Sequence, residues 1–553
     1  MNDEKRNAYA GRWVALLRGQ IVAQAATREK ALLFARLLRP KEVPELMYMT
    51  DSLPIFSSPL LETIRAAWPA ATPLHLVGGA LRDSLLGRDS RDLDFATPPG
   101  ALSLARELAN RLGAAYFPLD ADNDTARVIL PLENGRRAVL DFAGYRGPDL
   151  PADLRDRDFT INAIALDVFS GETLDPLGGA RDLREKRIRA CSPNSLSDDP
   201  VRILRAVRQA TAFGFSIEAQ TRQQMKEAVP GLTKISAERL RDELFKTLEG
   251  PAPDGALRAL DLLGVLPYVL PELPALKNVT QSPPHVHDVW THTLAVLRHL
   301  HAILALLDPR YDEEKSNADL FSGLLVTRLG RYRAQLGEHF AAPLTPDRSA
   351  RALLFFAALY HDIEKPATRS VEAGGRIRFF GHDEKGAATA LRRAIALRLS
   401  NAELDRLKII IRQHMRPHHF SSRKQAEAAD PSPRAIYRFF RETDEAGVDV
   451  LLLSLADLRA TYDHTLTREV WSAALDTVRA LLEAWYERPA EVIRPPQLLD
   501  GNDLQTEFKL PPGREIGQIL EAVRENQAAG RIANRAEALL FARGWLEAAR
   551  REK

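Results

Sequence analysis

Residues 74–97, LHLVGGALRDSLLGRDSRDLDFAT, determine how the first large folded part of this chain is built. Their hydrophobic pattern and their glycines predict a short series of elements. We expect a buried strand over 74–77, a tight turn at Gly78 and Gly79, a helix over 80–86 and a second strand over 92–95. This order of strand, glycine turn, helix and acidic strand indicates a functional site.

The second strand carries two aspartates, Asp92 and Asp94. Because side chains alternate along a strand, both carboxylates point to one face, while Leu93 and Phe95 face a core. Two carboxylates on one face can share a pair of divalent cations. Glycines before a helix let the backbone and the helix N-terminus approach a phosphate. Together these features are typical of nucleotidyl transfer.

The runs GGALRD, which ends in Arg82 and Asp83, and RDLDFAT also carry a family resemblance. They resemble the nucleotidyltransferase head of bacterial tRNA nucleotidyltransferases and their poly(A) polymerase relatives, class II of that superfamily. The resemblance implies a polymerase-β-like mixed-sheet head with Mg²⁺ held by Asp92 and Asp94. It also implies nucleotide contacts from the glycine turn and Arg82.

The composition is that of a multidomain globular protein. The 553 residues exceed a single core, and 45% hydrophobic with 27% charged residues give no sign of extensive disorder. No apolar run approaches the ~20 residues of a membrane span, and the start MNDEKRNAYAGR lacks a signal-peptide core, so we expect a cytoplasmic protein without membrane partners. The only cysteine, Cys191, excludes an internal disulfide and a thiolate zinc site. A net charge of +2 gives no argument for nucleic-acid binding.

A third carboxylate lies on a neighbouring strand. Strands are predicted over 126–130 and 139–142, and the second of them carries Asp141. Asp141 is a candidate to join Asp92 and Asp94 as a catalytic carboxylate. The alternative is an ordinary acid on an edge strand.

Residues 153–167, DLRDRDFTINAIALD, with the downstream DPLGGARDL, match the second block of the family. The resemblance implies that Arg157, Asp158 and Asn162 lie near the sugar and the triphosphate of the nucleotide. Asp156 stands where family members usually have the first of two arginines. The phosphate contact of that arginine is therefore not carried over to this chain.

A basic stripe opens the helical region that follows. In SDDPVRILRAVRQATAFGF, residues 197–215, the nucleotide-contact candidates Arg202, Arg205 and Arg208 recur every three residues on one side of a helix. The resemblance implies that Asp199 and Arg202 select the incoming base. A carboxylate accepts from an exocyclic amine and a guanidinium donates to ring acceptors, which suits the edges of C and A. The alternative is an N-cap aspartate with a surface arginine.

The connection between Asp141 and Asp153 bears on how many nucleotides are added. It consists only of FAGYRGPDLPA, residues 142–152. Family members that add both C and A carry a longer flexible loop there, so the resemblance favours the CC-adding subtype. A complete CCA-adding enzyme and a poly(A) polymerase are alternatives within the same class. A phosphohydrolase whose head only binds RNA is an alternative of a different class.

Most of the histidines follow, from residue 276 onward. A His-Asp pair on an apolar helix, with a histidine before it and an aspartate after it, can meet at one cation in a helical bundle. This layout resembles the HD superfamily of metal phosphohydrolases. The resemblance implies a metal quartet of His292, His361, Asp362 and Asp457, and a second metal position formed by His382, His414 and His418 or His419. The expected ion is a divalent transition metal or Mg²⁺, with Lys365 holding a substrate phosphate.

The expected fold class is therefore α+β, with a nucleotidyltransferase (polymerase-β-like) mixed-sheet head, an all-α neck and body, an all-α HD domain and a helical tail. The expected domains are a strand-strand-helix module over 1–50, the head over 51–190, the neck and body over 191–275, the HD domain over 276–490 and the tail over 491–553. The expected function is template-independent addition of CMP from CTP to the tRNA 3′ end. ATP is a further candidate substrate, and a separate A-adding enzyme is expected to act afterwards.

Overall fold

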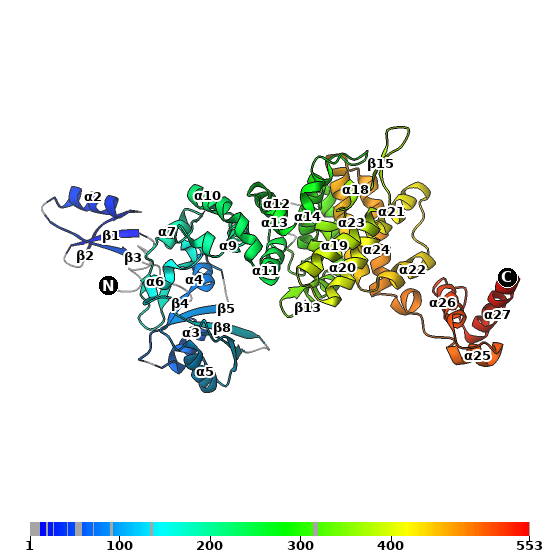
Figure 1. Cartoon of the computed structure of the whole chain (residues 1–553), viewed down its shortest axis with the longest axis horizontal. Coiled ribbons are helices and arrows are strands. Elements are labelled where there is room, and N and C mark those ends of the chain that lie inside the picture. Colours follow the sequence, from blue (N-terminus) through cyan, green and yellow to red (C-terminus); the bar gives the residue numbers. More distant parts are fainter. Residues whose placement is uncertain are drawn as a thin grey trace. The chain divides into compact units, whose positions relative to one another are not determined.

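The computed structural model describes residues 12–17, 20–25, 27–40, 42–49, 58–69, 71–88, 92–132, 136–312 and 319–551. The chain forms two compact units. The first consists of Met1–Arg202 with Phe213–Ala228, and the second of Ile203–Ala212 with Val229–Lys553. Figure 1 shows their elements along the chain.

The first unit begins with a small sheet of three antiparallel strands in the order β2-β1-β3. Its elements are β1 (Arg12–Leu17), β2 (Gln20–Ala25), α2 (Arg28–Leu38) and β3 (Glu45–Met49). The side chain of Thr27 caps α2 by accepting from the backbone N–H of Lys30. The two predicted strands and the helix are present, whereas β3 was not predicted.

The centre of the first unit is a mixed sheet of seven strands in the order β10-β9-β4-β5-β8-β7-β6. Strands β5 and β8 run parallel and the other neighbours antiparallel. The elements are α3 (Pro59–Ala67), β4 (His75–Val77), α4 (Gly78–Leu85), β5 (Asp92–Thr97), α5 (Ala101–Leu112), β6 (Ala115–Asp120), β7 (Thr125–Pro131), β8 (Arg137–Gly144), α6 (Leu150–Arg155), β9 (Ala165–Asp167) and β10 (Thr173–Leu174). The predicted mixed-sheet head is thus confirmed.

One face of this sheet packs against helices. Helix α5 contacts β6, β7 and β8. The ring of Phe142 on β8 stacks between Trp68, which ends α3, and Phe95 on β5, with centroid separations of 5.3 and 5.0 Å. Because side chains alternate along a strand, the residues next to Phe95 and Phe142 point to the opposite face.

Shorter elements complete the first unit. They are α7 (Gly179–Arg184), β11 (Arg187–Ile188), α8 (Ser195–Asp198), the start of α9 (Arg202–Phe213), β12 (Ser216–Ile217) and α10 (Ala219–Ala228). Strands β11 and β12 form a parallel pair.

The second unit is largely helical, as predicted. Its main helices are α11 (Ala237–Leu248), α12 (Pro253–Leu262), α13 (Leu266–Val269), α14 (Val289–Leu306), α15 (Leu320–Leu329), α16 (Arg333–Ala341), α17 (Ala350–Tyr360), α18 (Lys365–Thr368), α19 (His382–Ala396), α20 (Asn401–Gln413), α21 (Arg416–Glu427), α22 (Pro433–Thr443), α23 (Ala446–Tyr462) and α24 (Arg468–Tyr486). Two short hairpins, β13 (Pro343–Thr345) with β14 (Arg348–Ser349) and β15 (Arg369–Val371) with β16 (Ile377–Phe379), interrupt them.

Two helices form the centre of this bundle. Helix α17 is buried from Ala352 to Tyr360, and its Phe355 and Phe356 are fully buried. Helix α23 is buried along nearly its whole length and packs against α14. Because both helices lie in the interior, they can place polar side chains there at fixed positions.

Three helices at the end of the chain have a core of their own. They are α25 (Gly501–Phe508), α26 (Arg514–Ala528) and α27 (Arg535–Arg551). Leu504, Ile519 and Ala538 are completely buried in this core. Asp500 and Asp503 form a reciprocal capping box at the start of α25. The helical tail is thus confirmed. Within the part of the chain that the structure describes, no helix has the length and apolar character of a membrane span.

Candidate functional sites

Strand β5 presents Asp92 and Asp94 on the face of the sheet opposite α3 and α5. Both side chains are exposed, and they alternate with the buried Leu93 and Phe95 as the sequence predicts. Carboxylate oxygens on one exposed face are the ligands that Mg²⁺ prefers. The arrangement therefore fits the predicted cation site.

Asp141 lies directly opposite Asp94 in the parallel pair of β5 and β8. Its carboxylate forms a two-pronged ion pair with Arg127 on β7, with Nε 2.8 Å from Oδ1 and Nη2 2.9 Å from Oδ2. Over the described residues, Asp92, Asp94 and Asp141 are not among the groups whose ligand atoms all lie within 4.8 Å of one another. Asp141 is a neighbour of the pair, and its catalytic role stays a prediction.

Gly78 and Gly79 form the first residues of α4, where the sequence predicted a turn before the helix. Gly78 has a φ of +72°, and an added Cβ would lie 3.0 Å from Oδ2 of Asp94 and 3.4 Å from Nη1 of Arg157. The N–H of Gly79 donates to the Asp94 carboxylate. The glycine conformation thus brings the start of a helix directly to the acidic strand.

The electrostatics at Asp94 favour a cation. Although the side chain keeps contact with solvent, partial desolvation by the surrounding protein raises the pKa of Asp94, and the nearby charge of Asp141 raises it further. Arg157 and the Gly79 N–H oppose this shift. A bound divalent cation would relieve the repulsion between the carboxylates.

Arg82, Asn162 and Asp158 form one hydrogen-bonded chain. Nη1 of Arg82 donates to Oδ1 of Asn162 at 2.8 Å, and Nδ2 of Asn162 donates to Oδ1 of Asp158 at 2.9 Å. The guanidinium of Arg82 also stacks over the ring of Phe213, 4.6 Å from its centroid. Asn162 and Asp158 are buried, so this chain fixes α4 against the second family block.

Arg157 lies next to the acidic strand and is oriented by a second acid. Its Nε and Nη2 donate to Oδ2 of the buried Asp153 at 3.2 and 3.1 Å. The guanidinium is therefore held in place beside Asp94 and Gly78, where a triphosphate would need positive charge.

Arg202 is buried and oriented by backbone carbonyls. Its Nη1 donates to the carbonyls of Ser195 and Arg157 at 3.1 and 3.3 Å, and its Nη2 donates to that of Asp156 at 3.0 Å. Nε lies 3.7 Å from Oδ2 of Asp199. The predicted pair is thus adjacent, and Asp199 precedes the helix as expected.

Arg205 and Arg208, further along α9, share one acid. Their Nε atoms donate to the two oxygens of the buried Glu243 on α11, at 3.1 and 2.8 Å. The two side chains are about a third exposed, 34% and 27%. Their contact with nucleotide stays a prediction, and Glu243 is a partner that the sequence did not indicate.

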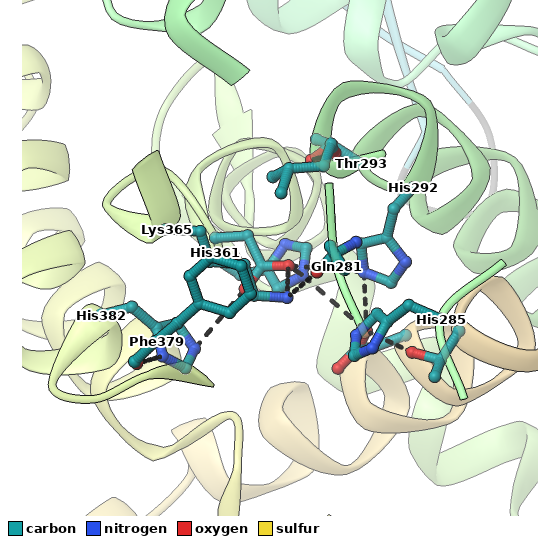
Figure 2. A network of polar contacts seen from close by, with 12 residues as sticks. Gln281, His285, His292, Thr293, His361, Lys365, Phe379 and His382 are labelled. Carbon is teal, nitrogen blue, oxygen red and sulfur yellow. Dashed lines mark hydrogen bonds and ion pairs between the residues drawn. The ribbon is translucent and has the colours of Figure 1, made fainter. Parts of the chain in front are cut away.

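The second unit gathers the HD residues from five segments of the chain, and Figure 2 shows the labelled His292, His361 and His382 among them. Two groups of ligand atoms each lie within 4.8 Å of one another. The first is His292 on α14, His361 after α17 and Asp457 on α23. The second is Asp362, His382 at the start of α19 and His414 after α20.

In three histidines of this cluster, a hydrogen bond at Nδ1 leaves Nε2 available as a metal ligand. Nδ1 of His361, His382 and His414 lies 2.8, 2.7 and 2.6 Å from the backbone carbonyls of Ala358, Phe379 and Ile411, respectively. A carbonyl can only accept, so Nδ1 carries the proton and Nε2 keeps its lone pair. Burial lowers the pKa of His414 to about 3, which keeps this ring neutral.

The two aspartates hold the cluster together. Nε2 of His292 lies 2.9 Å from Oδ1 of Asp457, and Nε2 of His361 lies 3.1 Å from Oδ2 of Asp362. Burial opposes the ionisation of Asp362, yet His361 and Lys365 hold its pKa well below the usual range. The residues present therefore fit two divalent cations bound by nitrogen and oxygen.

Of the alternatives His418 and His419, His418 contacts an aspartate of the cluster. Its Nε2 lies 2.8 Å from Oδ2 of Asp457, whereas His419 is exposed, and which of the two joins the second metal position stays a prediction. Lys365 lies at the cluster as predicted, with Nζ 2.7 Å from Oδ2 of Asp362 and from Oε1 of Gln281.

A cavity of about 520 Å³ opens at this cluster. Its lining includes Asp362, Lys365, His382, His418 and Asp457, together with His285. The His285 ring packs edge-on against His292 at 5.4 Å. Neither His285 nor Gln281 belongs to the spaced His-Asp pattern, so neither was predicted at this site; the run SPPHVHD, which contains His285, is a signal that was available.

Sequence comparisons agree with this arrangement. The description "Poly A polymerase head domain" applies to residues 74–189 and "HD domain" to residues 289–457. Between and after them lie matches to an "RNA and SrmB- binding site of polymerase A" over residues 214–276 and to "tRNA nucleotidyltransferase domain 2" over residues 481–542.

Known proteins match over most of the chain. The A-adding tRNA nucleotidyltransferase of Deinococcus radiodurans is 33% identical over 482 residues, 85% of this chain and 95% of the relative. The CC-adding tRNA nucleotidyltransferase of Geobacter sulfurreducens is 33% identical over 463 residues, 84% of this chain and 89% of the relative. A solved CCA-adding enzyme in complex with ATP has the same fold, with a TM-score of 0.57 and 21% identity over 90% of this chain and 98% of that one.

Proposed function

The chain belongs to the tRNA nucleotidyltransferases, and on this premise we propose that it adds two C residues from CTP to the 3′ end of tRNA, without a nucleic-acid template. In this proposal a separate enzyme adds the terminal A afterwards. The complete CCA-adding, A-adding and poly(A)-adding reactions are the alternatives that the first experiment distinguishes.

The observation that carries the CC-adding proposal is the short connection between β8 and α6. The N–H of Tyr145 donates to the carbonyl of Thr97 at 2.9 Å, and that of Arg146 to Oδ1 of Asp153 at 3.3 Å. Asp149 caps α6 by accepting from the N–H of Ala152 at 2.8 Å. The connection is thus short and is hydrogen-bonded at Tyr145, Arg146 and Asp149, in contrast to the long flexible loop that the family resemblance implies for members that add both C and A.

We assign the chemistry to the exposed face of the head sheet. When bound, Mg²⁺ at Asp92 and Asp94 lowers the pKa of the terminal RNA hydroxyl and neutralises the triphosphate and the leaving pyrophosphate. Gly78 leaves room for the triphosphate beside the start of α4, because it has no side chain there. Arg157, fixed by Asp153, supplies positive charge on the same side.

We assign base selection to Asp199 and Arg202. The carboxylate accepts from the exocyclic amine of C, and the guanidinium donates to its ring acceptors. The carbonyl-bearing edge of U offers the opposite pattern to Asp199. Fixed protein side chains would thus take the place of a template.

The experiment uses the full chain, Mg²⁺ and a tRNA transcript lacking its CCA end, with CTP, ATP or both, and resolves products to single nucleotides. Growth by two residues with CTP and none further with ATP is the expected result. Growth by three with both nucleotides, a long tail with ATP, or addition of one A only to a transcript already ending in CC would each replace the CC-adding proposal by the corresponding alternative.

The variant Asp92→Ala tests where the reaction occurs. We expect it to abolish incorporation of CMP while leaving the HD cluster, which lies in the second unit, able to bind its metal. Incorporation at the wild-type rate would contradict catalysis by the head and favour an RNA-binding role for it.

We propose a metal-dependent phosphohydrolase activity as a second function, because the two ligand groups around Asp362 and Asp457 lie beside a cavity of about 520 Å³. When bound, divalent cations there would activate water for attack on a phosphoester. Lys365 lines the same cavity and would hold the phosphate. Hydrolysis of p-nitrophenyl phosphate with Mn²⁺, Co²⁺, Ni²⁺ or Mg²⁺, lost in Asp362→Ala and kept in Asp92→Ala, is the expected result. No hydrolysis by the wild-type chain with any of these ions would contradict the proposal.

A further inference from the structure

The register of the head sheet places a row of residues next to the acidic strand. Reading from β4 to β6, the directly paired positions are Val77, Asp94, Asp141, Arg127 and Phe117. Directly paired residues of neighbouring strands point to the same face of a sheet. Phe117 is therefore on the face of Asp94, at the outer edge of the sheet.

Two contacts on the other face support this orientation. Phe142, the residue after Asp141, is stacked between Trp68 and Phe95. Tyr116, the residue before Phe117, lies under the guanidinium of Arg106 on α5 at 4.9 Å. Because neighbours along a strand alternate, Asp141 and Phe117 must face away from the helices.

One half of the sheet face that carries the aspartates is covered by other residues, and the other half is exposed. Around β4 and β9, Val77 and Ala96 are buried in one cluster with Leu150 and Leu154 of α6. Towards β6, by contrast, Arg127 is 40% exposed and Phe117 47% exposed. Leu119 is also exposed, at 51%, but it lies at a shift in the register of β6 against β7, so the pairing places only Phe117 on this face, beside the cationic Arg127.

The chemistry of nucleotidyl transfer gives this exposed half of the face a role. In our proposed function the triphosphate lies on the Gly78 and Arg157 side of Asp94. The attacking hydroxyl and the leaving pyrophosphate stand roughly in line on opposite sides of the reacting phosphorus. The RNA end must therefore reach Asp94 from the opposite side, which is the side of Asp141 and Arg127.

We propose that the last nucleotides of the tRNA 3′ end lie across β8, β7 and β6, with a backbone phosphate near Arg127 and a base stacked on Phe117. Exposed aromatic rings beside positive charge are the features that hold single-stranded RNA without reading its sequence. Arg127 also neutralises Asp141, so the RNA does not meet an uncompensated carboxylate in this row. This inference rests on the proposed function, because it takes Asp92 and Asp94 as the reaction centre.

The first test measures steady-state CMP incorporation as a function of the concentration of tRNA lacking its CCA end. We expect Phe117→Ala to raise KM for tRNA by about tenfold, the effect of losing one stacked base, with KM for CTP changed less than about twofold. Phe117→Tyr, which keeps an aromatic ring, should restore the wild-type value. Phe169→Ala is the matched control, because Phe169 is 40% exposed in the same unit and lies outside the row.

A second measurement, photo-crosslinking, tests the same inference if Phe117→Ala folds poorly. A photo-reactive benzophenone amino acid at position 117 should crosslink to the terminal nucleotides of the tRNA, and the same group at position 169 should not. Arg127→Gln should also reduce the slope of log Kd for tRNA against log salt by about 0.7, as expected for one phosphate contact to a single strand.

The possible outcomes distinguish a failure of the RNA-binding inference from a failure of the proposed nucleotidyltransferase function. Three results would overturn the proposed RNA position on β8, β7 and β6 without affecting the proposed catalysis. They are an unchanged KM for tRNA in Phe117→Ala, an equal rise in its KM for CTP, and equal crosslinking from positions 117 and 169. Failure of the wild-type chain to incorporate CMP at all would instead count against the proposed function.

Discussion

Arg208 donates from Nε to Oε2 of Glu243 over 2.8 Å, and this bond links the basic stripe of α9 to the interior of the helical unit. Arg205 reaches Oε1 of the same carboxylate at 3.1 Å. Periodicity predicted only that the stripe lies on one side of a helix. The structure shows that at these two positions the positive charge also balances a buried acid.

Replacing Glu243 by alanine should lower the free energy of unfolding by about 2 kcal/mol. Removal of one partner of a buried ion pair costs about 3–5 kcal/mol, and the partial exposure of Arg205 and Arg208 reduces this. Glu238→Ala, an exposed acid in the first turn of α11, is the control and should cost less than about 1 kcal/mol. Urea unfolding followed by circular dichroism gives both values, and equal values for the two variants would contradict the structural role of the pair.

The same pair predicts a pH dependence of stability. Burial alone would raise the pKa of Glu243, but Arg208 and Arg205 hold it below the usual value. Because the folded-state pKa is depressed, the contribution is complete above the unfolded-state pKa of about 4.3. It is lost as the pH falls through the folded-state pKa. The stability difference between wild type and Glu243→Gln should therefore shrink below about pH 4, and a difference that stays constant from pH 7 to pH 3 would argue against it.

Gly78→Ala should reduce kcat/KM for CTP by at least about tenfold. The positive φ strains any residue with a side chain by roughly 1–2 kcal/mol, and the new methyl group would lie 3.0 Å from Oδ2 of Asp94. Gly79→Ala should have a smaller effect, because its methyl group would meet only Nη2 of Arg82 at 3.5 Å, an ordinary contact. Single-turnover incorporation assays compare the two, and a larger loss for Gly79→Ala would show that the cradle is assigned to the wrong glycine.

Arg202→Lys should lower kcat/KM for CTP about tenfold or more although the charge is kept. The guanidinium spans the carbonyls of Asp156, Arg157 and Ser195, and a lysine ammonium cannot reproduce this planar fork. Arg258→Lys, at an exposed position of α12, should behave like wild type. Steady-state kinetics with CTP and UTP provide the measurement. Wild-type kinetics for Arg202→Lys would show that only the positive charge at this position matters and not the shape of the guanidinium.

Metal analysis should find two divalent ions per chain at the HD cluster after loading with Mn²⁺ and gel filtration, when all proteins compared carry Asp92→Ala to weaken the head site. The double variant His382→Ala with His414→Ala removes two of the three ligands of the second group, so we expect one ion. His464→Ala, an exposed histidine outside both groups, should retain two. One ion in all three proteins would mean that the second group does not bind metal.

Chelation should also lower the melting temperature of the chain. Binding to the folded state alone stabilises it by mass action, and the ligands come from helices that are far apart in the sequence. Differential scanning fluorimetry of Asp92→Ala before and after chelation tests this effect without the complete head site. An unchanged melting temperature would indicate that the cluster forms equally well without metal.

Local sequence determined the elements that carry the chemistry. The alternation of Asp92 and Asp94 with Leu93 and Phe95 requires the two carboxylates to share a face, whatever the strand packs against. This prediction depends on periodicity and on side-chain type, which are properties of a short stretch of chain. The metal quartet of His292, His361, Asp362 and Asp457, by contrast, was implied by the resemblance to the HD superfamily.

Pairing between distant segments was decided only by the tertiary structure. Nothing near Asp141 in the sequence indicates that Arg127 will take both of its oxygens, because that contact depends on the register of β7 against β8. Strand β6 is short and exposed, so its hydrophobic pattern was too weak to predict it. The same holds for Glu243 and His285, whose partners lie on other helices. Strand register and helix packing bring side chains together by contacts between distant segments, and a local sequence pattern does not specify these contacts.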